Sequence, residues 1–331
     1  MPGPHDALFR YVFSQPEHAA AELRAVLPPT LVAHLDWTSL ELQPASFVDE
    51  RLGERQADLL FSVRCDGRPA FVYVLLEHQS TSDPLMAFRV LRYVVRIWDA
   101  FLGEHPDSVR LPAVLPVVVH HSKQGWSAAT DLCSLLDLDT QSLSLVAPYV
   151  PQFRFVLDDL SEAADEALRG RSLTALATAG LMLLARGRTT LDLLADMRRW
   201  TDVFGQIASA RNGVEALAAL LEYAFRVGDL EPEDLRQLAV GLGPAAHEAY
   251  MTAAQKLTAE SYARGISDGE AKGEAKGKAE GKAELLIRLL SLRFGAVSDA
   301  TREKVFRAPS GRLDLWAERV LSGASIEEIL G

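Results

Sequence analysis

The chain has 331 residues, of which 48% are hydrophobic and 24% charged, and its formal net charge is -11. This composition is typical of a soluble globular protein, and the length accommodates two or three domains with separate cores. The acidic balance argues against a general nucleic-acid coat protein. It does not exclude an enzyme with a local basic cleft, because the field at the site matters more than the total charge.

Cysteine usage and hydropathy indicate the compartment. Cys65 and Cys133 have neither metal-site spacing nor the density of a disulfide framework, which favours a reducing cytoplasm. Residues 1–11 lack the apolar segment of a signal peptide. The most apolar helical run, residues 173–185, is shorter than the ~20 residues that span a bilayer. We therefore expect a cytoplasmic protein without a membrane partner.

Residues 5–27 show helical periodicity in two pieces, with a break at Pro16. Glu17 and Glu22 lie on the second piece and are candidate ligands of a metal site. The alternative is that both are solvated surface acids, which is the commoner state of glutamate on a helix. After these helices, residues 40–48 predict a first strand.

The stretch from residue 55 to residue 79 predicts a β-hairpin, because two segments rich in β-branched and aromatic residues flank a turn at residues 65–69. Asp58 and Glu77 lie inside these otherwise apolar strands. A half-buried carboxylate is costly without a partner such as a metal ion, so the two acids are the first candidates for function.

Strand alternation and loop length decide how the two acids meet. A two-residue loop at 66–67 brings Leu75 opposite Asp58 and makes Glu77 the diagonal neighbour on the same face, with Cα atoms roughly 7–8 Å apart. A four-residue loop places Asp58 directly opposite Glu77. Both lengths bring the two carboxylates and Gln79 together, whereas a three-residue loop breaks the apolar and the acidic patterns.

Residues 80–84 carry a helix-start signal, and a helix is expected over residues 85–101. Arg89, Arg92 and Arg96 are spaced three and four apart and therefore share one face of this helix. One interpretation is a solvated basic stripe. The other is a surface that contacts phosphate groups, since the helix follows directly after the strand with the second acid.

A continuous apolar strand is predicted for residues 111–120, of the kind that is buried on both faces. The strand ends at His120, and the segment that opens there, with His121 and Lys123, is dense in groups able to touch phosphate or a base. Adjacent histidines point to opposite sides of an extended chain, so a shared metal site is not expected. A loop-surface role is the default expectation, and substrate contact, including contact through Lys123, is the alternative.

Helical periodicity dominates from about residue 153, starting with a helix over residues 158–169. A long helix from Pro244 leads into a repeat in which glycine recurs every fourth residue from Gly265 to Gly281. Close pairing of two helices along the glycines would explain the repeat and give self-association, whereas a flexible charged spacer is the simpler alternative. The expected division is residues 1–150 for a catalytic core, 151–260 for a helical bundle, 261–283 for a charged linker and 284–331 for a small helical domain.

The chemistry expected of this chain uses oxygen ligands, because the sequence contains no cluster of histidine or cysteine with ligand spacing. The carboxylates of Asp58 and Glu77 favour a hard cation, in the first place Mg²⁺. Such a site can hold a metal-bound water and stabilise the oxyanions of phosphodiester hydrolysis. The arginines on the following helix would position a negatively charged substrate.

These residues resemble a known pattern. Asp58, followed by Glu77-His78-Gln79 on the next strand, is similar to the Asp…(Asp/Glu)-x-Lys signature of the PD-(D/E)xK nuclease superfamily. More closely, the chain resembles the Rpn family of recombination-promoting nucleases, also labelled transposases, over roughly residues 1–260. The segments that carry this resemblance are His5-Asp6, Arg55 to Phe61, Leu76 to Ser80, Met86 to Tyr93, and Leu115 to Trp126.

The resemblance implies an α/β fold of the restriction-endonuclease type, with a mixed sheet flanked by helices, a helical half and a small helical C-terminal domain. It implies DNA as the substrate, cleaved with little sequence specificity, in recombination or against foreign DNA. By this resemblance Asp58 and Glu77 bind Mg²⁺ or another divalent cation, the backbone carbonyl of His78 completes the site, and Gln79 orients water. The expected phosphate contacts are Arg89, Arg92, Arg96 and Lys123.

Gln79 stands where the superfamily usually has lysine. A lysine can help to deprotonate water, whereas a neutral amide can only orient it and donate a hydrogen bond, so water activation must rest mainly on the metal. One alternative is therefore a nucleic-acid-binding, regulatory or transposase-accessory module on a nuclease fold with weak or absent catalysis. Another is a purely structural hairpin in which the acids pair with Arg55 or Arg64.

Overall fold

The structure is a computed structural model that describes residues 3–44, 58–77, 82–161, 165–187, 189–190, 192–323 and 325–331. At residues 75–77 and at 264, 267, 268, 271 and 275 the description covers the backbone. The chain forms two compact units, Met1–Ala254 and Gln255–Gly331. Each unit has a hydrophobic core of its own.

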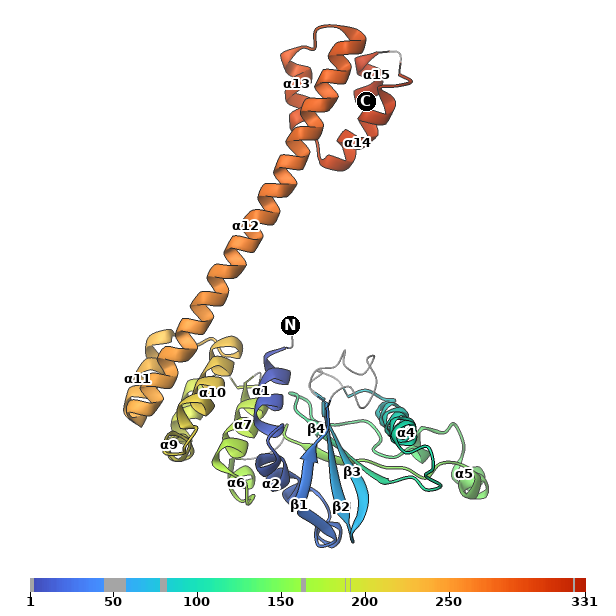
Figure 1. The fold of residues 1–331 in the computed structure, drawn as a ribbon, viewed down its shortest axis with the longest axis vertical. Coiled ribbons are helices and arrows are strands. Elements are labelled where there is room, and N and C mark those ends of the chain that lie inside the picture. Colours follow the sequence, from blue (N-terminus) through green and yellow to red (C-terminus); the bar gives the residue numbers. More distant parts are fainter. Residues whose placement is uncertain are drawn as a thin grey trace. The chain divides into compact units, whose positions relative to one another are not determined.

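A five-stranded sheet lies at the centre of the first unit, with its strands in sequence order (Figure 1). β1, β2 and β3 form an antiparallel meander, whereas β4 pairs parallel with β3, and β5 pairs parallel with β4. A parallel neighbour needs a crossover, which helix α4 (Met86–Glu104) provides between β3 and β4. The strands are Leu35–Leu42 (β1), Leu59–Cys65 (β2), Arg68–Glu77 (β3), Ala113–His120 (β4) and Val156–Asp159 (β5).

Two predicted elements differ from the structure. β1 begins at Leu35, before the predicted strand over residues 40–48, and residues 45–48 lie outside the described residues. The predicted helix over residues 158–169 is wrong at its start, because this segment opens with the end of β5. Asp158 and Asp159 pair there with Val119 and His120 of β4, so the start of the segment completes the sheet. A short helix, α6 (Asp165–Arg169), follows.

The β2–β3 hairpin closes through a two-residue turn, and its ladder runs back to Leu59, which lies opposite Val74. Asp66, with a φ of 48°, and Gly67, with a φ of 76°, form the turn. Positive φ at both central residues is what a type I′ turn requires, and this turn matches the twist of the flanking strands. Of the two loop lengths that the sequence left open, the two-residue loop is confirmed.

The two faces of the sheet are covered by different helices (Figure 1). α1 (Pro4–Phe13) and α2 (Pro16–Val26) lie on the first face, where Phe61 and Val72 are fully buried, and α7 (Ala175–Arg186) packs against these two helices. α4 covers the second face and packs against alternate residues of the same strands, as the pleat demands. Those residues and their α4 partners are Leu60, Phe71, Tyr73, Val118, Val90 and Ile97.

The helices that follow β5 complete the core of the same unit. α1 contacts both α7 and α10 (Gly213–Val227), and one cluster of buried residues extends from the sheet through these helices to Ala253. The expected division at residue 150 falls inside this unit, ahead of β5. The other helices of this half are α8 (Leu193–Arg199), α9 (Thr201–Ala208) and α11 (Pro232–Leu242), and α3 (Pro29–Val32) and α5 (Thr140–Val146) lie earlier in the chain.

The glycine repeat is part of one helix, α12 (Pro244–Phe294). Apart from the neighbouring backbone of the helix itself, a Cβ atom added at any repeat glycine would meet no atom within 4 Å, so these glycines do not serve close packing against other described parts of the chain. In the second unit, α13 (Asp299–Phe306), α14 (Ser310–Arg319) and α15 (Ile326–Leu330) form a small core with the end of α12. The described helices include none with the length and hydropathy to cross a membrane.

Candidate active site

Asp58 lies directly before β2 and is held by Tyr73 of β3. The Tyr73 hydroxyl donates a hydrogen bond of 2.6 Å to Oδ2 of Asp58, a length typical of a strong bond to a charged oxygen. Tyr73 is 2% exposed, and burial, followed by the charge of Asp58, raises the pKa of its phenol well above the usual value. The phenol therefore stays protonated, remains a donor and fixes the orientation of the carboxylate.

Two arginines approach Asp58 from different elements. Arg10 of α1 donates a hydrogen bond of 3.4 Å to the backbone carbonyl of Asp58. Arg89 of α4 forms an ion pair of 3.1 Å with Asp83. The positive charge of Arg89 also opposes the rise in the pKa of Tyr73, so the guanidinium lies within electrostatic range of the Tyr73–Asp58 pair. Arg89, one of the predicted phosphate contacts, thus lies within electrostatic range of the tyrosine that holds Asp58.

The second predicted acid, Glu77, is the last residue of β3. One further step of the hairpin ladder would bring Leu75 opposite Asp58, with Glu77 two residues farther along the strand. This backbone register is the one that the sequence predicts for a two-residue loop. The side chain of Glu77 and the whole of His78 and Gln79 lie outside the described residues.

The chemistry of the described residues fits a hard divalent cation. Asp58 offers carboxylate oxygens, which such cations prefer. A carboxylate accepts several bonds, so the hydrogen bond from Tyr73 is compatible with metal binding, and bonds of this kind orient ligating carboxylates in many metal sites. Among the residues that the structure describes, no three or more His, Cys, Asp or Glu side chains gather to hold a metal, and the predicted ligand set extends beyond those residues.

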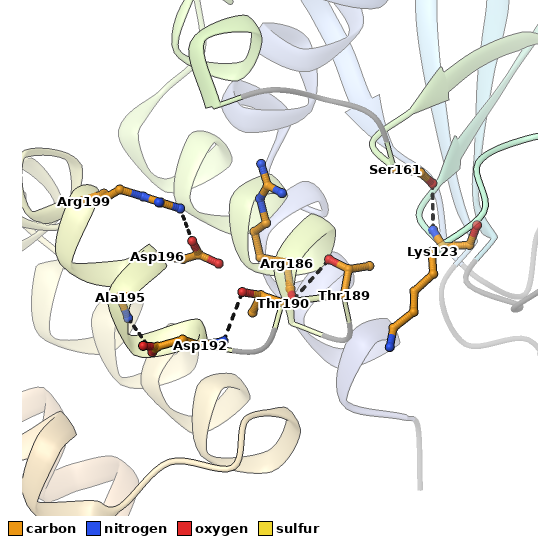
Figure 2. A pocket seen from close by; sticks show the side chains of 10 residues that line it. Lys123, Ser161, Arg186, Thr189, Thr190, Asp192, Ala195, Asp196 and Arg199 are labelled. Carbon is orange, nitrogen blue, oxygen red and sulfur yellow. Dashed lines mark hydrogen bonds and ion pairs between the residues drawn. The ribbon is translucent and has the colours of Figure 1, made fainter.

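The remaining predicted phosphate contacts lie apart from one another. Arg92 is exposed on α4, and Arg96 is half-buried on the same helix. Lys123 follows β4 and lines a polar pocket of about 670 Å³ beside α7 and α8, the helical side of the first face (Figure 2). Lys123 and the arginines of α4 therefore belong to different sides of the sheet.

Glu22 belongs to a buried ion triad on the first face. Arg171 donates to Glu22 over 2.9 Å and to both carboxylate oxygens of Asp158 over 2.6 and 3.0 Å. Burial and then the charge of Asp158 raise the pKa of Glu22, against the opposing effect of Arg171. Glu17 has a side chain that is 73% exposed and lies 3.4 Å from His18. The described contacts thus give Glu22 a structural role and leave Glu17 on the surface.

The expectation of a loop surface for the two adjacent histidines is wrong. His120 is 0% and His121 is 2% exposed. Their expected divergence is present, because His120 lies 3.1 Å from the hydroxyl of Ser122 and against Trp126, whereas the ring of His121 lies 4.9 Å from that of His5 on α1. The apolar run of β4 was the available signal, since its buried environment continues through both residues.

The mixed sheet with helices on both faces is compatible with an α/β nuclease-like fold. Residues 3–215 match the family described as "Putative transposase, YhgA-like". The chain belongs to this family, and the resemblance to the Rpn nucleases is confirmed by its relatives. No solved structure matches the chain.

Three relatives from Escherichia coli (strain K12) illustrate the range within the family. Recombination-promoting nuclease RpnA is 40% identical over 120 residues, which are 36% of this chain and 40% of RpnA, so the chain spans about two fifths of that relative. Inactive recombination-promoting nuclease-like protein RpnE is 27% identical over 270 residues, or 80% of this chain and 85% of RpnE. Putative inactive recombination-promoting nuclease-like protein YjiP is 42% identical over 94 residues, 28% of this chain and 91% of YjiP.

Proposed function

We propose that this chain is a metal-dependent DNA endonuclease of low sequence specificity, acting in recombination or against foreign DNA. The main support for the proposal is the hydrogen bond that the buried hydroxyl of Tyr73 donates to Asp58, directly before β2. A catalytic carboxylate must be held in a fixed orientation, and a second layer of hydrogen bonds is the usual means. The 40% identity to a protein named a recombination-promoting nuclease supports the same class of reaction.

The architecture supports the assignment to the PD-(D/E)xK class. The sheet is mixed and flanked by helices. Asp58 lies directly before β2 and Glu77 ends the neighbouring strand β3, and the register of these strands favours a diagonal pair. In such a pair the two residues approach closely enough for their carboxylates to share a cation.

Each residue of the proposed site has one task. Asp58 and Glu77 supply carboxylate ligands, and the backbone carbonyl of His78 supplies a third oxygen. When bound, a divalent cation, in the first place Mg²⁺, supplies Lewis acidity and lowers the pKa of a coordinated water. Gln79 orients the attacking water, because an amide accepts and donates hydrogen bonds but does not remove a proton at neutral pH. Tyr73 keeps the Asp58 carboxylate in place.

Positive charge near the acids suits a phosphodiester substrate. Arg89 carries its charge close to the Tyr73–Asp58 pair, and its side chain is 13% exposed. Guanidinium groups bind phosphate oxygens through directed, charge-assisted hydrogen bonds. Arg92, Arg96 and Lys123 are proposed to extend the DNA-contacting surface, which would give a local basic field in a chain of net charge -11.

A second candidate function is DNA binding or regulation without efficient cleavage. RpnE, which aligns over 80% of this chain, is named inactive. Gln79 also favours this second function, because it stands where the superfamily usually has lysine and its neutral amide cannot take a proton from water.

A plasmid-nicking assay separates the two functions. Supercoiled DNA is incubated with Mg²⁺ and the wild type, Asp58→Asn or Glu77→Gln. The proposal expects nicking by the wild type, loss of nicking in both variants, and full activity in Asp107→Asn, a matched change at an exposed acid on the loop before β4. Nicking that survives in both site variants would overturn the site. Retained DNA binding without any nicking by the wild type would establish the second function instead.

A further inference from the structure

A polar pocket lies beyond the carboxyl ends of β4 and β5, on the side of α7 and α8 (Figure 2). Its volume of about 670 Å³ is within the range of small-molecule sites, ~300–1,000 Å³. In open α/β sheets, ligands commonly bind outside the carboxyl ends of parallel strands. The strand side of the pocket contributes Lys123 and Ser161, and the helical side contributes Arg186, Thr190 and Asp196.

Two cations enter the pocket from opposite sides. Lys123 comes from the segment after β4 and is exposed, and within the described part of the chain no hydrogen bond or ion pair engages its ammonium group. Arg186 comes from the end of α7 and is anchored by an ion pair of 3.0 Å with Asp165. A guanidinium and an ammonium group that line one pocket suit an anion that carries several acceptor oxygens, as a phosphate does.

Two hydroxyl groups in the pocket each accept a hydrogen bond from a backbone N–H. The hydroxyl of Ser161 accepts the backbone N–H of Ser122 over 2.8 Å, and that of Thr190 accepts the backbone N–H of Asp192 over 3.2 Å. Each hydroxyl has one proton of its own to donate. These bonds fix the two oxygens in position, so their protons are available to the oxygens of a bound anion.

The pocket also contains a buried acceptor. Asp196 is 6% exposed and pairs through Oδ1 with Arg199, whereas its Oδ2 is buried and has no hydrogen-bond partner among the described residues. A buried carboxylate oxygen normally has a partner, and an N–H or O–H of a ligand would provide one. The phosphate dianion of a monoester carries no such donor, so a phosphate monoester in this pocket would meet Asp196 with a donor from another part of the ligand.

We propose that this pocket binds a nucleotide, with its phosphate monoester at Lys123 and Arg186 and a sugar hydroxyl or base amino group at Asp196. The lining contains no aromatic side chain among the described residues, so recognition uses the phosphate and the donors rather than base stacking. A free nucleotide and the 5′-phosphorylated end of a DNA strand present the same chemistry. Binding in the pocket does not require cleavage at Asp58 and is therefore independent of the proposed function.

Calorimetric titration of the full chain in the presence of a chelator tests this assignment. The probes are deoxyadenosine 5′-monophosphate, inorganic phosphate, and a short single-stranded oligonucleotide with a 5′-phosphate or a 5′-hydroxyl. Lys123→Ala is expected to weaken binding of the monophosphate about tenfold or more, because a charged hydrogen bond is lost. Asp196→Asn is expected to weaken the monophosphate but not inorganic phosphate. Arg110→Ala, an exposed cation before β4, is the matched control and should change neither affinity.

The two sources of the ligand give different results. Tighter binding of the 5′-phosphorylated strand than of the 5′-hydroxyl strand, lost in Lys123→Ala, identifies the strand end. Equal binding of the two strands, with the monophosphate bound through Lys123, identifies a free nucleotide. Failure of the folded wild type to bind either phosphorylated probe at millimolar concentration, or an unchanged affinity in Lys123→Ala, overturns the proposal. Since Lys123 is exposed, its variant keeps the test valid even if Asp196→Asn loses stability with its Arg199 pair.

Discussion

The buried hydroxyl of Tyr73 donates its proton to Oδ2 of Asp58 across 2.6 Å. Tyr73→Phe removes this bond and keeps the ring, so the Asp58 carboxylate loses the hydrogen bond from the phenol that orients it. If Asp58 binds the proposed cation, the affinity for Mg²⁺ measured by calorimetry should fall about 10–100-fold, as it does when outer-layer partners of metal ligands are removed.

Tyr93→Phe is the control for this change. Its ring centroid lies 5.4 Å from that of Tyr73, so the variant removes a hydroxyl from the neighbouring ring of the same cluster. Its Mg²⁺ affinity should equal that of the wild type. Equal losses in the two variants would indicate a general loosening of the α4 face and would contradict a specific role for Tyr73.

Arg171 holds two buried acids, Glu22 with a side chain 6% exposed and Asp158 with a side chain 4% exposed. Arg171→Met keeps most of the side-chain volume but leaves the two carboxylates together without a counter-charge. We expect the free energy of unfolding, measured by urea denaturation, to fall by about 3–5 kcal/mol. The exposed Arg110→Met should change it by less than about 0.5 kcal/mol. Similar losses in both variants would show that the triad is not a major source of stability.

The pKa of Glu22 predicts a pH dependence of stability. Burial and Asp158 raise this pKa above 4.5 in the folded chain. A group with a raised folded-state pKa contributes its full stability below the unfolded-state pKa and loses it as the pH rises through the folded-state pKa. The free energy of unfolding of the wild type minus that of Glu22→Gln should therefore decrease as the pH rises above 4.5. A difference that increases over this range would give Glu22 the opposite shift.

The glycines of α12 give opposite predictions for stability and for self-association. At Gly269, Gly273 and Gly277 an added methyl group meets nothing within 4 Å beyond the neighbouring backbone of the helix, so each change to alanine should stabilise the helix by about 0.5–1 kcal/mol. Circular dichroism during heating measures this gain. If two copies pair closely along the glycines, as we propose, the same triple variant should lose its dimer in sedimentation. An unchanged association state would rule out glycine-mediated pairing.

The hairpin register could be predicted from the sequence because two local rules agree. Asp66-Gly67 suits a two-residue turn, and strand alternation requires the apolar faces to coincide. The partner of Asp58 could not be predicted in the same way. A tyrosine in a strand fits any buried face, and the approach of Tyr73 to Asp58 depends on how α4 packs over both of them.

Elements and contacts that depend on residues far apart in the chain were harder to predict from the sequence. β5 is four residues long and ends in two acids, which locally resemble a helix start, and it becomes a strand because β4 offers an edge to pair with. Glu22 looked like a surface acid because its partner Arg171 lies far along the chain. Lys123 was expected to contact phosphate, as were the arginines of α4, and its position beside α7 depends on the course of the segment after β4.

Nδ1 of His5 lies 2.8 Å from the hydroxyl of Tyr223, which ties the first helix of the chain to α10. α1 thus packs against helices of the later half, and they share one core with the sheet. A fragment cut at residue 150 would lose β5 and expose the apolar side of α1. The helices that carry none of the predicted metal ligands are consequently part of the framework that keeps Asp58 in place. The unit up to Ala254 should unfold in a single transition and should not yield a smaller, transplantable nuclease module.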